Sequence, residues 1–106
     1  MVRVVYDRDY HRVSITGHAQ SDEKGKDLIC ASASILAYTL ADYVKKAEEE
    51  KRVWCSVTYL EEGDAIISCS PNAGQSDGIT LVFDSICRGF ELLARDYPDN
   101  ISYEVK

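Results

Sequence analysis

Several signals of particular protein classes are missing from the sequence of 106 residues. It has two prolines, no internal repeat and no low-complexity tract, and we see no apolar run that approaches the length of a membrane span. Residues 1–10 alternate apolar and polar side chains and include charge from the start, unlike a signal peptide. We therefore expect a cytoplasmic protein without a membrane partner, with reduced thiols and with residues 1–106 forming a single domain.

Basic residues are also in short supply. Twelve Lys and Arg against 18 Asp and Glu give a formal net charge of −6. An acidic protein does not attract phosphate, so direct binding to nucleic acid is disfavoured, and a basic protein or peptide is a better-matched partner. The charge alone is better explained by solubility, since many cytoplasmic proteins are mildly acidic.

The four cysteines form no CxxC pair, which argues against a zinc ribbon and a thioredoxin-like motif. A metal site assembled from all four is less expected than buried thiols, so we predict no metal and no cofactor. Cys55 and Cys69 fall in line with apolar residues of predicted strands, and Cys87 borders the apolar stripe of a predicted helix. Packing therefore accounts for these three cysteines.

Alternating apolar and polar residues predict five strands, at residues 2–7, 12–17, 53–60, 65–70 and 101–105. The turn between the first two includes His11, which we expect at the surface. EEGD forms the turn of the second hairpin. In the third strand one face is predicted to carry Val53, Cys55, Val57 and Tyr59. The open face of the sheet would carry Val5, Trp54, Leu60 and Ile66, either as an oligomer interface or as scattered exposed residues.

Apolar residues at helical spacing predict one helix over Leu28–Glu49 and a second from Ile79 to just before Tyr97. Asp27 is a good N-cap for the first helix, and Asp77 could cap the second. Because the first helix is apolar around much of its first half, we expect it to be covered on more than one side. The order β-β-α-β-β-α-β predicts an α+β fold, a two-layer sandwich with both helices on one face of a mostly antiparallel sheet.

The segment from His18 to Cys30 combines residues suited to acyl transfer. With Asp27 as N-cap, Cys30 would be the third residue of the first helix, where free amides and the helix dipole favour a thiolate. A thiolate is a nucleophile, histidine is the usual partner for proton transfer, and amides of the same turn could stabilise an oxyanion. By spacing alone, however, a Cys–His pair is a weak signal.

Two neighbours of the pair allow alternative interpretations. Asp27 either caps the helix or orients His18 and gates the loop. Ser34, one helical turn after Cys30, either hydrogen-bonds near the thiol or is a small residue that allows close packing.

Two short runs, Gly17-His18-Ala19 and Gly25-Lys26-Asp27-Leu28-Ile29-Cys30-Ala31-Ser32-Ala33-Ser34, together resemble the ribosomal-processing cysteine protease family of Firmicutes and related bacteria. The resemblance implies a homodimeric endopeptidase that removes a short N-terminal extension, with an aromatic pair followed by a small residue, from large-subunit ribosomal protein twenty-seven. It also implies that Cys30 is the nucleophile, that His18 is the general base, and that Asp27 and Ser34 support the site.

The same resemblance implies a lid over the substrate, formed by the glycine-bearing loop 20–26 and its flanks. The lid residues would include Gly17, Ala19, Gly25 and Lys26. The sequence departs from the family pattern at Ser32, where alanine or glycine is usual, and in the loop sequence QSDEK.

Two other functions are compatible with the residues. A non-catalytic module that binds a basic ribosomal protein during assembly would explain the acidic charge, and its binding would survive loss of Cys30. A thiol redox sensor would need a reactive Cys30 but no dependence on His18.

Overall fold

The computed structural model describes residues 1–17 and 26–106, with side chains described from residue 28 onward in the second range. The strands are β1 (Val2–Asp7), β2 (Arg12–Thr16), β3 (Val53–Glu61), β4 (Asp64–Pro71) and β5 (Ile101–Val105). The helices are α1 (Lys26–Glu49), α2 (Ser76–Asp96) and a short 3-10 helix at Arg8–Tyr10. This order confirms the predicted β-β-α-β-β-α-β arrangement.

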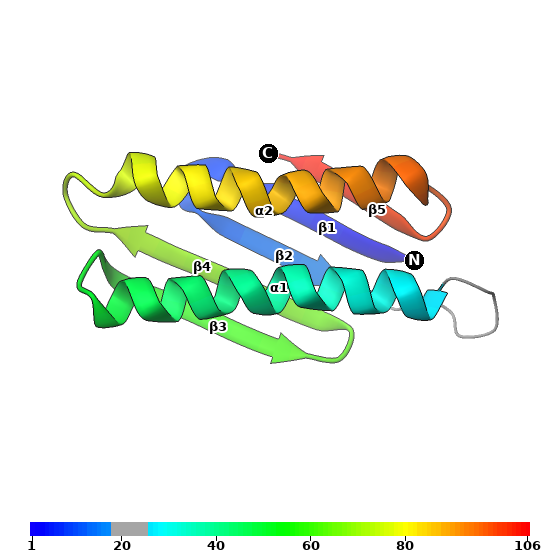
Figure 1. Cartoon of the computed structure of the whole chain (residues 1–106), viewed down its shortest axis with the longest axis horizontal. Helices are drawn as coiled ribbons and strands as arrows, with labels where there is room; N and C mark the ends of the chain where they lie inside the picture. Colours follow the sequence, from blue (N-terminus) through cyan, green and yellow to red (C-terminus); the bar gives the residue numbers. More distant parts are fainter. Residues whose placement is uncertain (18–25) are drawn as a thin grey trace.

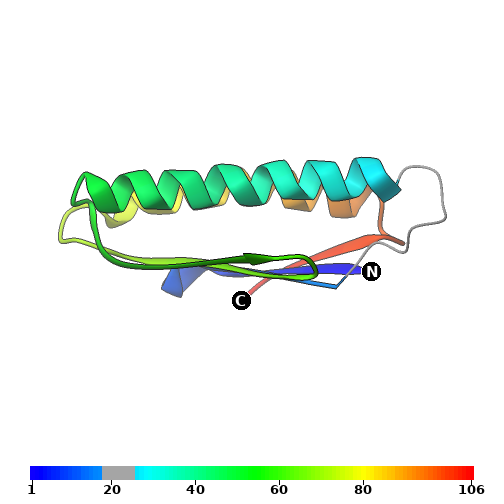
Figure 2. The ribbon, with the colours of Figure 1, turned by 90° about the horizontal axis from the view of Figure 1, so that it is seen from below.

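The strands form one sheet in the order β3-β4-β2-β1-β5, in which the pairing of β1 with β5 is parallel and the others are antiparallel. The two helices lie side by side over the same face of this sheet (Figures 1 and 2). The predicted α+β fold with two layers is therefore confirmed. The two helices run in opposite directions. The first residues of α1 lie at the end of the molecule where β2 ends (Figure 1).

The core fills the space between the helices and the sheet. Strand residues with alternating burial meet one stripe of each helix there, and the largest fully buried side chains are those of Tyr6, Phe83, Phe90, Ile29, Leu40 and Ile67. The helices also approach each other closely at Gly89, where an added Cβ would lie 2.8 Å from Leu36 Cδ2. A glycine at this position therefore permits the close approach of α2 to α1.

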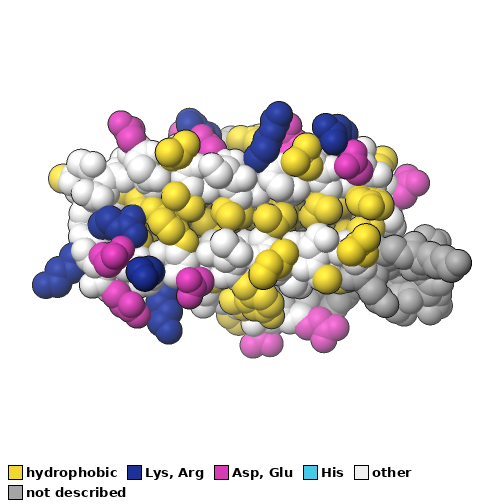
Figure 3. Space-filling view, viewed as in Figure 1, with side chains coloured by type: hydrophobic (Ala, Val, Ile, Leu, Met, Phe, Trp, Pro, Cys, Tyr) yellow, Lys and Arg dark blue, Asp and Glu magenta, His cyan; other side chains and the backbone are white. Residues whose placement is uncertain are grey.

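The burial of α1 differs from the expected cover on more than one side. Ile29, Ala33, Ala37 and Leu40 are buried against the sheet and α2. Ile35, which lies outside this buried stripe, has an exposed fraction of 62%. The helix therefore buries one apolar stripe, whereas other large apolar side chains, those of Leu28, Ile35 and Tyr38, are exposed. Figure 3 shows hydrophobic side chains in a band along the helical face of the molecule.

The predicted face of β3 is wrong because the strand has a bulge. Its register against β4 shifts between Val53 and Cys55. A bulge inserts one residue and so exchanges the two faces of all that follows. Val53 is buried, but Cys55 and the next outward residues are exposed, and Leu60 turns from the predicted open face to pack against the core.

Both helices begin before their predicted first residues. Since α1 begins at Lys26, Asp27 is its second residue and not its N-cap. Likewise α2 begins at Ser76, with Gln75 as N-cap, so Asp77 lies in the first turn. Favourable carboxylates are common throughout the first turn as well as at the N-cap, which makes the exact start hard to read from sequence.

The prediction that no apolar run approaches the length of a membrane span is also corrected by the structure. Residues Leu28–Glu49 of α1 have a stretch long and apolar enough to cross a membrane, with a mean hydropathy of 1.2. This is weak support for a membrane helix, because the core helix of a soluble protein meets the same criterion.

Candidate active site

A cleft of about 390 Å³ opens beside the first half of α1. This is within the usual size range of ligand sites. One wall is α1, the other is the β3–β4 hairpin, and the end of β2 closes one side. Its lining includes Cys30, Ser34 and Tyr38 from α1, Gly17 from the chain after β2, and residues 60–65 of the hairpin. Cys30 and Ser34, two of the predicted site residues, therefore share this cleft with Gly17.

Cys30 is exposed and is the fifth residue of α1. In a regular α-helix the first four amides have no partner within the helix, and they lie here one turn before Cys30. Helical side chains lean toward the amino end of their helix, so the Cys30 side chain inclines toward these amides. The thiol is thus accessible to a substrate and close to the positive end of the helix dipole. Cys30 was predicted to be the third residue of the helix. As the fifth residue it lies about one turn from the first residue of α1, farther than predicted.

Gly17 fixes how the chain leaves β2. Its φ of +94° lies in the left-handed region, and an added Cβ would lie 2.2 Å from the main-chain oxygen of Met1. Its N–H donates to the carbonyl of Gly63 at 3.0 Å, which ties the end of β2 to the β3–β4 turn. Only glycine suits this combination of backbone angle and close approach.

Several predicted site residues fall outside what the structure describes. His18, Ala19 and Gly25 lie between the described ranges. Lys26 and Asp27 are placed as the first two residues of α1, without a description of their side chains. Ser34 is exposed one turn after Cys30, as its spacing predicts.

The other cysteines separate into two kinds. Cys69 and Cys87 are buried, as predicted, and burial raises their pKa values to about 11 and about 12. Such thiols stay protonated at neutral pH and react slowly. Cys55 is exposed, contrary to prediction, because of the bulge in β3, but it does not line the cleft.

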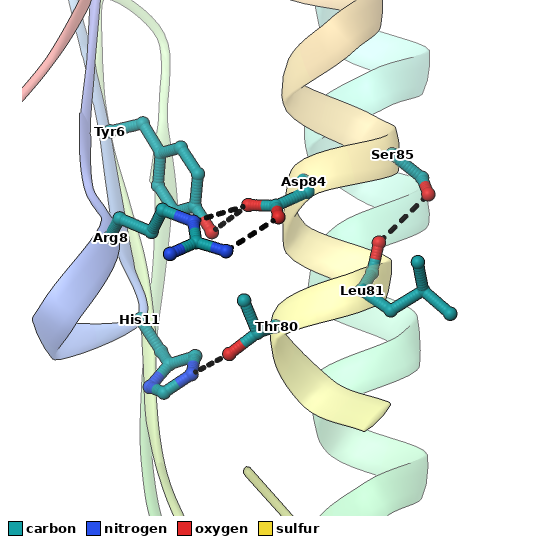
Figure 4. A network of polar contacts seen from close by, with 7 residues as sticks. All are labelled: Tyr6, Arg8, His11, Thr80, Leu81, Asp84 and Ser85. Carbon is teal, nitrogen blue, oxygen red and sulfur yellow. Dashed lines mark hydrogen bonds and ion pairs between the residues drawn. The ribbon is translucent and has the colours of Figure 1, made fainter. Parts of the chain in front are cut away.

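The prediction that His11 is a surface residue is wrong. His11 has an exposed fraction of 7%, its Nε2 lies 2.7 Å from the hydroxyl oxygen of Thr80, and its ring packs edge-on against Phe83. Its left-handed φ of +48° after the 3-10 helix turns the chain so that the ring points toward α2 (Figure 4). Burial, followed by repulsion from Arg8, lowers its pKa below the ordinary value.

Beside His11, α2 is held by Asp84. The carboxylate accepts hydrogen bonds from the Tyr6 hydroxyl at 2.8 Å and from Arg8 Nε and Nη2 at 3.1 and 3.0 Å (Figure 4). The hydrogen bond from Arg8 is the main cause that lowers the pKa of Asp84. This cluster lies at the end of the sheet where β2 begins, whereas the cleft lies where β2 ends. The five residues of the strand separate the two by about 17 Å. The cluster therefore holds the fold together away from Cys30.

Acidic side chains of the β3–β4 hairpin were interpreted from sequence only as part of a turn. Glu61, Glu62 and Asp64 line the cleft opposite α1. Their place could have been suspected from the short EEGD loop, but the neighbouring helix wall follows only from the tertiary structure. Among the described side chains, those of residues 1–17 and 28–106, no group of three or more from His, Cys, Asp or Glu could hold a metal ion.

An exposed thiol in a cleft, near the amino end of a helix on an α+β scaffold, has the features of a thiol-dependent enzyme. The family model described as cysteine protease Prp matches residues 1–102. The chain therefore belongs to the Prp family and is a cysteine protease. This finding favours the protease over a non-catalytic binding module and over a redox sensor.

Solved structures share the fold. SMU.848 from Streptococcus mutans is 22% identical with a TM-score of 0.69, and the match covers 98% of this chain and 90% of that one. The essential ribosomal processing protease Prp from S. aureus, in complex with a covalently linked product peptide, is 19% identical with a TM-score of 0.70, covering 99% and 97%. The same protease with a substrate peptide is 18% identical, with the same TM-score and the same shares of each chain covered. The comparison with curated proteins gave no match.

Proposed function

We propose that this cysteine protease removes a short N-terminal extension from large-subunit ribosomal protein twenty-seven in the cytoplasm. The observation that carries the proposal is the exposed Cys30 in a cleft of a Prp-family chain. The S. aureus relative, a ribosomal processing protease with peptide complexes, supports the substrate class. The net charge of −6 also suits a basic protein substrate.

In the proposed mechanism, Cys30 is the nucleophile and His18 the general base. His18 accepts the thiol proton while the sulfur attacks the scissile carbonyl carbon, and it returns that proton to the amine as the C–N bond breaks. Water then hydrolyses the thioester and restores the thiol. Gly17 supports this pairing, since it lines the same cleft as Cys30 and directly precedes His18 in the chain.

The remaining predicted residues have supporting roles in this proposal. Ser34 lies one turn from Cys30 on the cleft wall, where its hydroxyl can hydrogen-bond a substrate or the thiol. Asp27 orients His18. The loop 20–26, with Gly17 and Ala19 before it, covers the bound peptide.

Cleavage of a synthetic peptide with an aromatic pair followed by a small residue tests the proposal. Cys30→Ala should reduce kcat/KM by about 10³-fold or more, because it removes the thiol that lies in the cleft. His18→Ala should also impair cleavage strongly. Cys55→Ala is the matched control, since it removes another exposed thiol outside the cleft and should leave the rate unchanged. Equal cleavage by Cys30→Ala and the natural sequence would reject the proposed nucleophile.

We further propose that the protein is a homodimer. Exposed apolar side chains support this state on both faces, with Leu28, Ile35 and Leu81 on the helices and Val57 and Tyr59 on β3. Light scattering after size-exclusion chromatography would measure the mass. Ile35→Gln and Val57→Gln would then identify which face is buried, and a monomer at all accessible concentrations would reject the dimer.

A further inference from the structure

We propose that the turn between β3 and β4 positions the general base through one main-chain hydrogen bond, which makes Gly63 a positioning residue. The carbonyl of Gly63 accepts this bond from the N–H of Gly17 at 3.0 Å. Gly17 directly precedes His18 in the chain. The inference deepens the proposed mechanism, in which His18 is the base, and rests on it. It adds the part of the fold that holds the chain in place next to that base.

The hydrogen bond lies beyond the last residue pair of two regular strands. The pairing of β2 with β4 ends at Thr16 and Asp64, and Gly17 and Gly63 adjoin these two residues. Both glycines have a left-handed backbone, with φ of +94° and +79°, which residues of a regular strand do not adopt. The chain therefore changes direction at Gly17 while it remains bonded to the turn.

Gly17 is restrained on a second side by the first residues of the chain. The main-chain oxygen of Met1 lies 2.2 Å from the position that a Cβ on Gly17 would occupy. The next residue, Val2, is buried, and its N–H donates to the carbonyl of Asn100 at 2.9 Å. Contact with Met1 limits movement of Gly17 in one direction, and the bond to Gly63 limits movement away from the turn.

The turn is a firm support for this bond because it is short. Only Glu62 and Gly63 connect β3 to β4, and the ladder between the strands begins at once with Glu61 and Asp64. Two-residue connections between antiparallel strands use few turn types. The orientation of the Gly63 carbonyl is therefore determined by the hairpin.

The bond lies at the nucleophile, since Gly17, Gly63 and Cys30 line the same cleft. A peptide bond is planar, so fixing one residue limits the possible positions of the next. A displacement of about 1 Å in a reacting group can reduce a rate by about 10²-fold. In the proposed mechanism, the bond to Gly63 therefore favours proton transfer from Cys30 by restraining the residue before the base.

An amide-to-ester substitution tests the bond without adding a side chain. Residues 1–29 are synthesised with glycolic acid in place of Gly17 and joined to residues 30–106 by native chemical ligation at Cys30. The natural sequence is assembled in the same way. For the peptide with an aromatic pair and a small residue, kcat should fall about tenfold and KM should change by less than about twofold, because the bond acts on the base.

The hydroxy-acid analogue of Val13 is the matched control. Hydrogen-bonded positions recur at every second residue of an antiparallel strand, so from Gly17 they include Val13, which pairs with Ile67 and does not line the cleft. This ester should lower the free energy of unfolding, as the Gly17 ester does, but leave kcat unchanged. An unchanged kcat for the Gly17 ester, or an equal loss for the control, would overturn the inference.

The same ester in a His18→Ala background separates positioning from a general weakening of the fold. The rate at which iodoacetamide alkylates Cys30 is measured by mass spectrometry and requires no turnover. A neighbouring imidazole activates a thiol, so the Gly17 ester should slow alkylation about threefold or more when His18 is present. Without His18 it should slow alkylation by less than about 1.5-fold. Equal slowing in both backgrounds would show a structural role only and overturn the inference.

His18→Ala alone distinguishes failure of the inference from failure of the proposed function. If this variant cleaves and is alkylated like the natural sequence, the proposed pair of Cys30 and His18 fails, and the inference fails with it. If His18→Ala slows both reactions and the Gly17 ester slows neither, the pair stands and the inference fails.

Gly63→Val keeps the test decisive if the ester protein does not fold. A β-branched side chain is strongly disfavoured at a left-handed φ, so this substitution alters the turn. It should slow alkylation of Cys30 only when His18 is present. Gly74→Val carries similar backbone strain, at a φ of +84° outside the cleft, and should not slow alkylation. Equal slowing by the two valine variants would overturn the inference.

Discussion

Polar side chains at the two ends of β2 differ in whether they are engaged by other residues of the fold. Before the strand, His11 and Asp84 are engaged by Thr80, Tyr6 and Arg8, and the ring of His11 is buried. After the strand, Gly17 opens onto a cleft with the exposed Cys30 and three hairpin carboxylates without ion pairs in the described part of the chain.

This comparison separates polar residues that hold the fold from those available for chemistry. A buried histidine with a hydrogen-bond partner costs little and stabilises the packing around it, but it cannot exchange protons freely with a substrate. An accessible thiol near free helix amides contributes little to stability but can attack a carbonyl. Substitutions at the first end should therefore change stability, and substitutions at the second should change activity.

The largest effect on both properties is expected at Gly17. Gly17→Ala places a Cβ against the main-chain oxygen of Met1 and forces alanine into a left-handed conformation. Together these should lower the free energy of unfolding by about 2–4 kcal/mol, measured by urea denaturation. Cleavage should also fall, because the backbone at the cleft must shift.

Gly74→Ala is the matched control for this substitution. Gly74 also has a left-handed φ, of +84°, but an added Cβ there meets nothing within 4 Å. It should cost only about 1–2 kcal/mol and leave cleavage unchanged. Equal losses for both variants would show that backbone angle alone matters and that the close approach at the cleft does not.

A smaller effect is expected at the closed end of the molecule. Tyr6→Phe removes the hydroxyl that donates to Asp84 and preserves the buried ring. The free energy of unfolding should fall by about 1 kcal/mol, with kcat/KM unchanged. Tyr10→Phe removes a hydroxyl from an exposed side chain and should have no effect. A loss of activity in Tyr6→Phe would contradict the separation of the two ends.

The smallest expected effect is the pH dependence contributed by His11. Its folded pKa lies below the unfolded value of about 6.5, so the unfolded chain binds the proton more readily. The stability contribution is complete above about pH 6.5 and is lost as the pH falls below it. Asp84, whose pKa is also lowered, acts only below its ordinary value of 3.8.

The free energy of unfolding is therefore compared between the natural sequence and His11→Gln at about pH 7.5 and about pH 5. The difference between the two proteins should be smaller at the lower pH, by about 1 kcal/mol or less. His11 faces Arg8, Asp84 and Asp9, and these charges are the same in both proteins. An unchanged difference between the two proteins at both pH values would contradict the burial argument.

Much of the fold could be predicted because local patterns specify it. The alternation in β1 and β2 and the stripe of Ile79 and Phe83 in α2 reflect the actual buried faces. The faces of β3 could not be predicted, since nothing in its alternating sequence indicates the bulge after Val53. The buried His11 was missed because its left-handed backbone, rather than its neighbours in sequence, turns it inward.

The candidate site was predictable in part. The position of Cys30 near the start of a long apolar helix was enough to predict an accessible thiol. The family motif predicts His18 as its partner, and His18 lies outside the described residues. The acidic hairpin wall could not be foreseen, because only tertiary packing brings the turn at Glu62 opposite α1.

The most direct test of the catalytic assignment is covalent trapping with a peptide chloromethyl ketone that ends in an aromatic pair. Peptide mapping by mass spectrometry should find the adduct on Cys30, and an excess of substrate peptide should block it. An adduct on Cys55 at the same rate, or labelling of Cys30 that the substrate does not slow, would contradict Cys30 as the nucleophile of this cleft.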